Sequence, residues 1–335
     1  MMMRHSVVVL LASTLIASTA TAQDAKLVDA AKKESGAIVA YGSMEQTQAE
    51  PIIEAFQKKS GLKVEYWRAS ATKAMDRALT ELRAGKALFD VMVNNSGAIR
   101  LMQKEGVFVK YISSAARNFP QEVVDAELGP KYRHAPVGIV YNKSMVKPAD
   151  APKTLEELLN PKYRGKVVMR DPTQHTTTLQ WVASLYKIIG KEKADRFIRD
   201  LGATKPFLVE SFAPAAERVM SGETPIAISL VRYVATGAEK GAPLDYVRLG
   251  KFLSIGQYLG LSKKAPHPNG GKALIDFFLG EESMKILATS GEFVTRKGIP
   301  HPVPDAGKIQ AVEMDDFEAN EFKEKSQEFQ KIFLK

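Results

Sequence analysis

Residues 172–178, Pro-Thr-Gln-His-Thr-Thr-Thr, form a polar stretch whose composition suits the capture of a small ligand. The residues before it predict a tight loop at 161–164 and a short buried strand at 166–169, and a helical pattern follows it. A turn that begins a helix presents backbone N–H groups without intrahelical partners, and threonine hydroxyls add further donors. We therefore expect His175 and Thr176 to hydrogen-bond a small polar or anionic molecule.

Three more polar segments follow predicted buried strands, at residues 43–46, 68–72 and 94–96. In open α/β sheets ligands bind where the carboxyl ends of the strands meet, so these segments are candidates to line a site. Helix capping by serine, threonine and asparagine is the alternative explanation for them. Together with the turn above and a later strand end, they give these neutral candidates for ligand binding: Ser43, Ser70, Thr72, Asn94, Asn95, Thr176 and Ser211.

Short apolar strands alternate with amphipathic helices along the chain. Between predicted strands at 37–41 and 62–67, the apolar residues Ala49, Ile52 and Phe56 share one face of a helix. The alternation recurs, with strands predicted at 87–93, 137–142, 206–210, 226–230 and 252–256, helices beginning near 269 and 281, and a terminal helix at 314–333. This order predicts an α/β fold of mostly parallel sheets flanked by helices, in two domains for a chain of 335 residues.

The first 22 residues predict a removable export signal. Arg4 and His5 precede an apolar core of about ten residues, and Ala20-Thr21-Ala22 fits a cleavage site, so the mature chain would begin at Gln23. That core is shorter than the roughly 20 apolar residues that span a bilayer, with a signal anchor as the alternative. Since the chain has no cysteine, it has no disulfide and no cysteine for a lipid anchor. We expect a freely diffusing periplasmic protein.

The composition argues against nucleic-acid binding and against catalysis. The formal net charge is +9, but the basic residues form no run of the kind that marks a nucleic-acid tail. The chain has no Gly-x-Ser-x-Gly elbow, its five histidines are scattered, and its Gly-Lys pairs at 165–166 and 271–272 lack the next residue of a phosphate loop. We expect no enzyme, no cofactor and no metal centre, and a diffuse positive charge that favours anions or merely aids solubility.

Several short segments, in their order and spacing, resemble the bacterial periplasmic solute-binding proteins that feed ABC importers. The closest resemblance is to the type that includes ferric-ion and phosphonate-type carriers, and it covers nearly the whole mature chain. The segments that carry it are Tyr41-Gly42-Ser43, residues 56–64, Phe89-Asp90-Val91, residues 138–142, residues 163–167 and residues 265–269.

The resemblance implies two α/β lobes of the type II periplasmic-binding-protein architecture, joined by crossing strands, with a solute held in an interlobe cleft and hinge closure around it. Lobe 1 would comprise residues 23–133 and 248–300, lobe 2 residues 134–247, and a C-terminal helical segment residues 301–335. It further implies a monomer that docks on an ABC permease of the inner membrane. A ligand-sensing partner of a chemoreceptor and a secreted enzyme are the alternative classes.

The chain departs from its ferric-binding relatives at the positions that hold the metal. Those relatives use a pair of adjacent tyrosines, where this chain has Val231-Arg232 with Tyr233 beyond, and their histidine and glutamate correspond to Glu45 and Asn95. An arginine suits a carboxylate or phosphonate, because its planar fork of donors binds such a group bidentately. We expect Arg232 to grip an anionic solute, with a surface arginine on a helix as the alternative, and ferric iron is the second candidate solute.

Other side chains have two explanations each. His175 either donates to the anion or serves as a capping or packing residue. Tyr41, Trp67 and Tyr233 either pack against an apolar part of the solute or, for the first two, belong to the core. We count His175 and Tyr233, with Arg232 and the neutral residues named above, among the expected ligand-binding residues.

Overall fold

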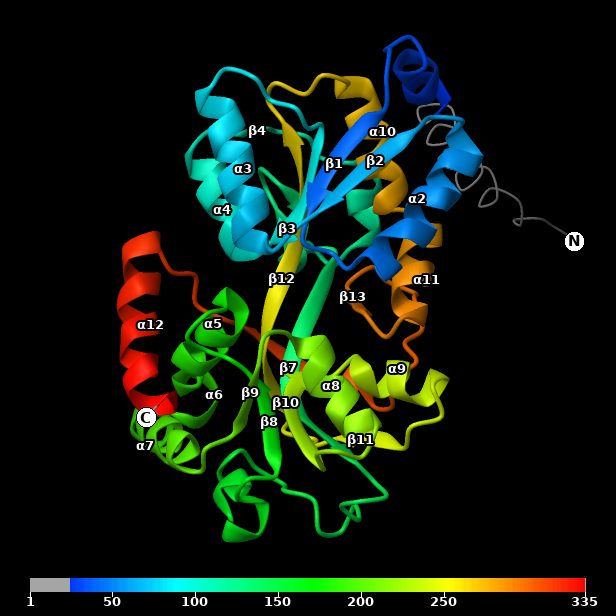
Figure 1. Ribbon diagram of the computed structural model, residues 1–335. Coiled ribbons are helices and arrows are strands. Elements are labelled where there is room, and N and C mark those ends of the chain that lie inside the picture. Colours follow the sequence, from blue (N-terminus) through cyan, green and yellow to red (C-terminus); the bar gives the residue numbers. More distant parts are fainter. Residues whose placement is uncertain (1–24, 335) are drawn as a thin grey trace, which may run out of the picture. The chain divides into compact units, whose positions relative to one another are not determined.

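The computed structural model describes residues 25–334, and the predicted export signal lies outside them. The chain divides into two compact units (Figure 1). Unit 1 consists of the described residues up to Val93 with Met102–Pro130 and Leu259–Ser283, and unit 2 consists of Asn94–Leu101, Lys131–Tyr258 and the described residues from Met284 on. Within residues 25–334, no helix is long and apolar enough to cross a membrane.

This division differs from the expected lobes at several places. Residues 94–101, 131–133 and 248–258, which the sequence placed in lobe 1, belong to unit 2. The sequence also placed residues 284–300 in lobe 1 and residues 301–335 in a separate segment, whereas residues 284–334 belong to unit 2. One cause is β14 (Gln310–Glu313), which pairs in parallel with the first residues of β12 (Lys251–Ser262). The other is α12 (Ala319–Phe333), whose Phe329 is buried in the core of unit 2.

The sheet of unit 1 is built around β1 (Ile38–Gly42), which pairs in parallel with β2 (Val64–Arg68) and β3 (Val91–Asn95). The last residues of β12 pair antiparallel with β4 (Phe108–Val109). α2 (Gln46–Ser60) ends at Gly61, whose φ of 74° is the left-handed conformation that glycine adopts without strain. Further elements are α3 (Ala71–Arg83), α10 (Pro268–Phe278), β5 (Val124–Asp125), β6 (Gly129–Pro130) and two 3₁₀ turns (Ser114–Asn118 and Gln121–Val123), while α4 (Ser96–Lys104) and α11 (Glu281–Thr289) contain residues of both units.

A buried carboxylate joins two of the segments that carry the family resemblance. Asp90 is fully buried, and its Oδ1 accepts a hydrogen bond from the backbone N of His267 at 2.6 Å. Its Oδ2 accepts from the backbone N of Val39 at 2.8 Å and lies 3.0 Å from Nδ1 of His267. Asp90 therefore fixes the start of α10 against β1, which gives these segments a structural role.

The central sheet of unit 2 has the order β7 (Arg133–Asn142), β10 (Ile226–Leu230), β8 (Val167–Arg170) and β9 (Phe207–Val209). β10, β8 and β9 run parallel, whereas β7 is antiparallel to β10, to β11 (Leu244–Tyr246), to β13 (Phe293–Val294) and to part of β12. The α/β class that the sequence predicted is confirmed, and β7 makes the sheet more mixed than expected.

Helices and turns complete unit 2. The expected terminal helix at 314–333 is wrong at its start, because α12 begins only at Ala319 after β14 and a capping box formed by Glu318 and Glu321. A helix that the sequence pattern did not predict is α7 (Lys191–Ala203), in which Ala194, Phe197 and Leu201 belong to the buried face. The remaining elements are α5 (Thr176–Ser184), α6 (Tyr186–Ile189), α7 (Lys191–Ala203), α8 (Phe212–Met220), α9 (Tyr233–Glu239) and the 3₁₀ turns Glu156–Leu159, Pro161–Tyr163 and Ala306–Lys308.

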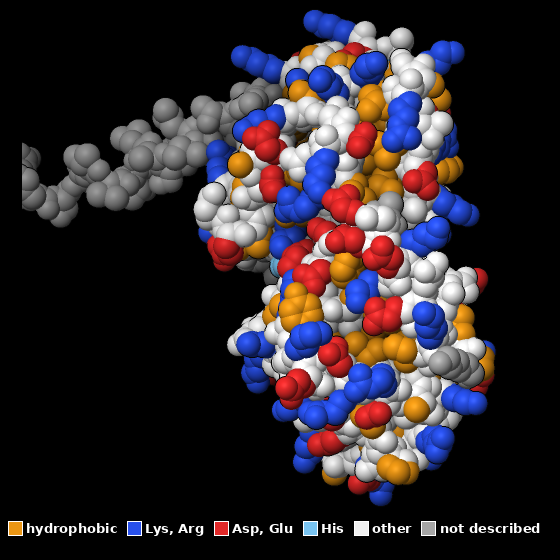
Figure 2. All heavy atoms as spheres, turned by 90° about the vertical axis from the view of Figure 1, so that its left-hand side faces the viewer, with side chains coloured by type: hydrophobic (Ala, Val, Ile, Leu, Met, Phe, Trp, Pro, Cys, Tyr) orange, Lys and Arg blue, Asp and Glu red, His pale blue; other side chains and the backbone are white. Residues whose placement is uncertain are grey.

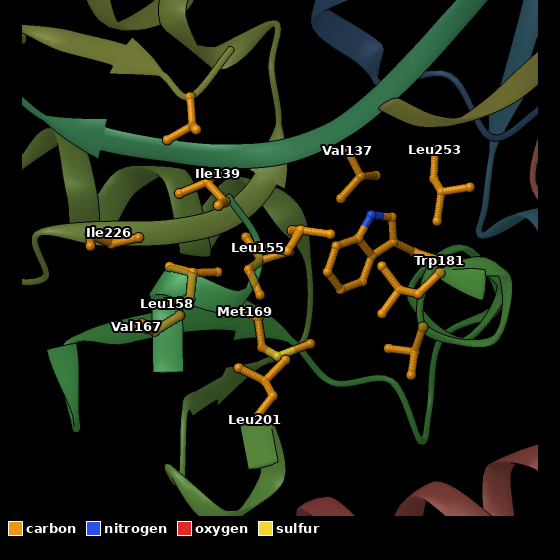
Figure 3. Close-up of a cluster of buried hydrophobic side chains, with 14 of the residues drawn as sticks. Val137, Ile139, Leu155, Leu158, Val167, Met169, Trp181, Leu201, Ile226 and Leu253 are labelled. Atoms are coloured by element: carbon orange, nitrogen blue, oxygen red, sulfur yellow. The ribbon is translucent and has the colours of Figure 1, made fainter. Parts of the chain in front are cut away.

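The core of unit 2 holds α5 against the sheet (Figure 3). Trp181 of α5 is 1% exposed, and its indole lies beside Val137 of β7 and Leu253 of β12. Burying a side chain of this size stabilises the packing of α5 by about 2–3 kcal/mol or more. This anchor fixes the position of the first turn of α5 at the end of β8.

Candidate functional site

The carboxyl ends of three parallel strands meet at one edge of the sheet in unit 2. Arg170 at the end of β8 lies opposite Val209 of β9, and β10 runs parallel to β8 on its other side. A helix begins shortly after each of these strands, namely α5, α8 and α9. The structure therefore brings together, at one edge of one unit, five of the expected ligand-binding residues: His175, Thr176, Ser211, Arg232 and Tyr233.

The start of α5 is the part of this edge best suited to an anion. His175 is the N-cap residue, its side chain makes no capping hydrogen bond, and the first intrahelical bond runs from Leu179 N to His175 O. The N–H groups of the residues between them point out of the helix at its positive end. The hydroxyls of Thr173, Thr176 and Thr178 are buried without a hydrogen-bond partner among the described residues.

Burying these hydroxyls costs free energy as long as no ligand accepts or donates a hydrogen bond to them. Thr173 is 4% exposed and Thr178 is 1% exposed, so neither hydroxyl is compensated by bulk solvent. A buried polar group without a partner costs about 1–3 kcal/mol. Thr173 lies just before α5 and Thr176 and Thr178 lie in its first turn, so three such groups occur within six residues.

Asp171 holds this turn through two hydrogen bonds. Its Oδ1 accepts from Thr173 N at 2.7 Å, and its Oδ2 accepts from Gln174 Nε2 at 3.1 Å. On the other side Ser326 Oγ of α12 donates to Thr173 O at 2.5 Å. Asp171 and Ser326 position the turn, and the sequence analysis named neither as a functional residue. The Asp-Pro-Thr pattern was a local signal for the first, but no local pattern marks Ser326.

Arg232 lies in a buried ion cluster. Its Nε is 3.1 Å from Glu292 Oε1, and its Nη2 donates to Tyr233 Oη at 3.1 Å while the guanidinium carbon lies 4.2 Å from the centre of that ring. Arg133 Nη1 is 2.7 Å from the same Glu292 oxygen. Because Arg232 is only 6% exposed, the alternative of a surface arginine is wrong. Its contact with a solute stays a prediction.

The electrostatics of this cluster follow from burial and from its charges. Burial lowers the pKa of the Arg133 guanidinium, but the Glu292 carboxylate and Tyr132 together outweigh burial and the nearby Arg232, so that the net shift of this pKa is upward. Burial also raises the pKa of the neighbouring Tyr132 to about 12. Both arginines are therefore cations and Tyr132 is neutral at any physiological pH.

The asparagines at the end of β3 lie next to the start of a helix. The expected loop at 94–96 is wrong, because Asn94 and Asn95 belong to β3 and Ser96 begins α4. Asn94 Oδ1 accepts from Asn95 N at 2.9 Å, and Asn95 Oδ1 accepts from Ala98 N at 3.0 Å. The capping alternative accounts for the bond that Asn95 accepts, and contact of either side chain with a solute stays a prediction.

The expected ligand-binding residues of unit 1 are Ser43, Ser70 and Thr72. Ser70 Oγ accepts from Lys73 N at 3.3 Å and caps α3, whereas Thr72 is exposed in the first turn of that helix. Ser43 is half-buried, and its N donates to Val93 O at 3.0 Å. The capping explanation thus holds for Ser70.

Two aromatic candidates in unit 1 belong to a packed cluster. Tyr41 is 2% exposed, with its ring 5.1 Å from those of both Trp67 and Phe89. The Arg77 guanidinium carbon lies 4.5 Å from the centre of the Tyr41 ring and 4.3 Å from that of the Trp67 ring. The core explanation therefore holds for Tyr41, and Trp67 packs with it.

Charge and metal-binding capacity complete the description. Figure 2 shows Lys and Arg side chains intermixed with Asp and Glu over the face that it draws, so the positive net charge is not gathered into a basic patch on that face. Among residues 25–334 no group of three or more His, Cys, Asp and Glu side chains is placed to hold a metal ion.

Comparisons with known proteins identify the family. Residues 41–285, well over half of the chain, match the family described as bacterial extracellular solute-binding protein. Iron uptake protein A1 of Synechocystis sp. is 25% identical over 326 residues, which cover 87% of this chain and 84% of that protein. Iron-bound HitA from Pseudomonas aeruginosa has a TM-score of 0.71 at 20% identity and covers 90% of this chain and 99% of its own.

A third similar protein was solved with a phosphorylated sugar. AfuA from Actinobacillus pleuropneumoniae, with fructose-6-phosphate bound, has a TM-score of 0.69 at 18% identity and covers 90% of this chain and 97% of its own. These likenesses confirm the predicted type II periplasmic-binding-protein fold.

Proposed function

The chain belongs to the bacterial extracellular solute-binding proteins and is the substrate-binding component of an ABC importer, and we propose that its solute is a small anion of the carboxylate or phosphonate type. The family is one of transport proteins, and its members work outside the cytoplasmic membrane, where they deliver the solute to an inner-membrane permease.

One observation carries the proposal for an anion, namely the turn at Thr173 together with the first turn of α5. It combines the outward N–H groups of a helix start with three buried threonine hydroxyls that lack partners among the described residues. All of these groups can donate a hydrogen bond, and the helix dipole adds a positive potential. A carboxylate or phosphonate would accept several of these bonds at once, whereas a cation would be repelled.

Arg232 and Ser211 support the same conclusion. Both lie at the sheet edge at which α5 begins, and the side chain of Ser211 makes no capping bond to α8. The arginine adds a permanent positive charge close to this edge.

A thermal-shift screen tests the proposal. The protein is unfolded, washed and refolded to remove carried solute, and then titrated with carboxylates, phosphonates and sulfonates, with uncharged sugars as the control. A ligand at a hundred times its Kd stabilises the folded protein by about 2.7 kcal/mol, which is readily measured. We expect at least one anion class to raise the Tm and the uncharged sugars to leave it unchanged. Stabilisation by the sugars alone would refute the proposal.

Ferric iron is the second candidate, because iron uptake protein A1 is named for iron and HitA was solved with iron bound. Against it, the position of the tyrosine pair holds Val231 and Arg232. The two candidates differ in their spectra, since ferric iron bound by phenolate gives a charge-transfer band in the visible range. Such a band after addition of ferric citrate would favour iron over a simple anion.

A further inference from the structure

Gln180 of α5 has one end of its side-chain amide bonded and the other end without a partner. The residue is 5% exposed. Its Nε2 donates to Asp315 O at 3.0 Å and to Asp316 Oδ1 at 3.2 Å. Its Oε1 is buried and has no hydrogen-bond partner within residues 25–334. A buried acceptor of this kind is uncommon in folded proteins, because leaving it without a donor costs free energy.

The bonded end of this amide fixes its orientation. Both partners of Nε2 are acceptors, so exchanging the nitrogen and the oxygen would set Oε1 against two other oxygens. Asp315 is itself held on α5, because its backbone N donates to Ser184 Oγ at 2.8 Å, one helical turn beyond Gln180. A flip of the Gln180 side chain therefore does not satisfy its oxygen.

Gln180 lies close to two residues that are expected to bind the solute. Thr176 precedes it by four positions in α5, so the two side chains share one face of the helix with their Cβ atoms about 5–6 Å apart. The Thr176 hydroxyl is also buried and has no hydrogen-bond partner among the described residues. In addition, a Cβ at Gly97 would lie 3.4 Å from Gln180 Nε2 and 3.7 Å from Asn95 Oδ1. The amide is thus near both the first turn of α5 and Asn95.

The two groups without partners on this face differ in chemistry. A threonine hydroxyl can donate as well as accept, whereas an amide oxygen only accepts. The first turn of α5, with its outward N–H groups, suits the anionic head of a solute, but an anion has no donor for Gln180 Oε1. This oxygen needs an O–H or N–H group, and burying a hydroxyl costs less than burying an ammonium group.

We infer that Gln180 Oε1 accepts a hydrogen bond from a hydroxyl of the solute, and that the solute is an anion with this hydroxyl about three bonds from its anionic head. This inference rests on the proposed function and deepens it, because it adds a second functional group to the anion. The spacing follows from the single helical turn between Thr176 and Gln180. Gln180 is then a specificity-determining residue, because an anion without the hydroxyl leaves its oxygen unpaired.

Two matched pairs of anions test the inference by thermal shift at equal ionic strength. They are 3-hydroxypropionate with propionate, and 2-hydroxyethylphosphonate with ethylphosphonate. We expect the hydroxylated member of at least one pair to bind about ten-fold more tightly than its partner, because it supplies a donor to a buried acceptor. Equal Kd values within each pair would overturn the inference and leave the proposed function intact.

Weak or absent binding of these probes is also decisive. If other anions of the screen raise the Tm but none of the four probes does, the inference fails while the proposed function holds. If no anion raises the Tm, the proposed function fails and the inference fails with it.

The variant Gln180→Met assigns the preference to this residue. Methionine is similar in length to glutamine and favours a helix, but its sulfur is only a weak acceptor. We expect the ratio of the two Kd values within the responsive pair to fall from about ten to about one. A shift of α5 would weaken both anions alike and keep their ratio, so the ratio separates this role from a merely structural one. An unchanged ratio in the folded variant would overturn the inference.

Gln57→Met is the matched control. Gln57 Oε1 accepts from Val64 N at 2.9 Å in unit 1, so its replacement should lower stability and keep the ratio of Kd values. A ratio that fell equally in this control would overturn the assignment to Gln180.

Gly97→Ala takes the place of Gln180→Met if that variant does not fold. The added methyl group would lie 3.0 Å from Asp316 Oδ1, which is one of the two acceptors that orient the Gln180 amide. Displacing this carboxylate should turn the amide and lower the ratio of Kd values. A ratio that stays the same as in the unchanged protein would overturn the inference.

Discussion

Replacing Thr173 by valine should change stability and affinity in opposite directions. The hydroxyl of Thr173 is buried and has no hydrogen-bond partner among the described residues, whereas its backbone N and O are held by Asp171 and Ser326. Valine keeps the shape of the side chain and both backbone bonds. It removes a group whose burial costs about 1–3 kcal/mol, so the free energy of unfolding should rise by about 1 kcal/mol.

The affinity for the anionic solute should fall in the same variant. A hydrogen bond to a charged group contributes about 1.5–3 kcal/mol, which corresponds to a loss of about ten-fold or more in Kd. Urea unfolding measures the first effect and isothermal titration calorimetry measures the second. If the hydroxyl had a purely structural role, the substitution would lower the free energy of unfolding and leave the affinity unchanged.

Thr204→Val is the matched control. The Thr204 hydroxyl donates to Leu201 O at 2.6 Å, away from the proposed site, so its removal should lower stability and leave the affinity unchanged. If Thr173→Val lowers stability and preserves affinity as this control does, the reasoning about the first turn of α5 is refuted.

Two further predictions concern charge. Arg232→Ala keeps the contact between Arg133 and Glu292, so the protein should fold while its affinity for the anion falls ten-fold or more by calorimetry; an unchanged Kd would remove Arg232 from the site. Burial, and then Lys131, lower the pKa of His134 to about 4, while Glu313 acts to raise it. As the pH falls, the unfolded chain therefore binds a proton at His134 before the folded protein does. Its contribution to stability is complete above pH 6.5 and is lost as the pH falls toward 4, by up to about 3 kcal/mol in the free energy of unfolding. In His134→Gln the free energy of unfolding, measured by urea unfolding at several pH values, should change less across this window. An equally steep loss in the variant would contradict the assignment to His134.

The parts of the fold that sequence predicts are those set by local patterns. The strand at 226–230 is found as Ile226–Leu230, because a short, mostly apolar run after a proline is typical of a buried strand. β14 was missed for the opposite reason. Its sequence Gln-Ala-Val-Glu has no strand pattern of its own, and it is a strand only because it pairs with β12.

The candidate site likewise has a part that local sequence patterns predict and a part that they do not. The turn before α5 was predictable, since its proline, threonines and histidine are contiguous and their chemistry is local. The sequence also singled out Arg232, but its partner Glu292 lies far along the chain, and no pattern predicts that contact. Ser70, Asn94 and Asn95 show the limit of residue type as a guide, because capping and ligand binding select the same side chains.

The support that α12 gives to the turn at Thr173 has a consequence for how this protein matures. Ser326 reaches back across 153 positions of the chain to hold the carbonyl of Thr173. During synthesis and export the segment containing the turn emerges long before its support, and contacts between such distant positions form slowly. The ability to bind a solute should thus be acquired only when α12 has docked. A nascent or clipped chain without α12 would lack the Ser326 contact that positions the proposed binding turn.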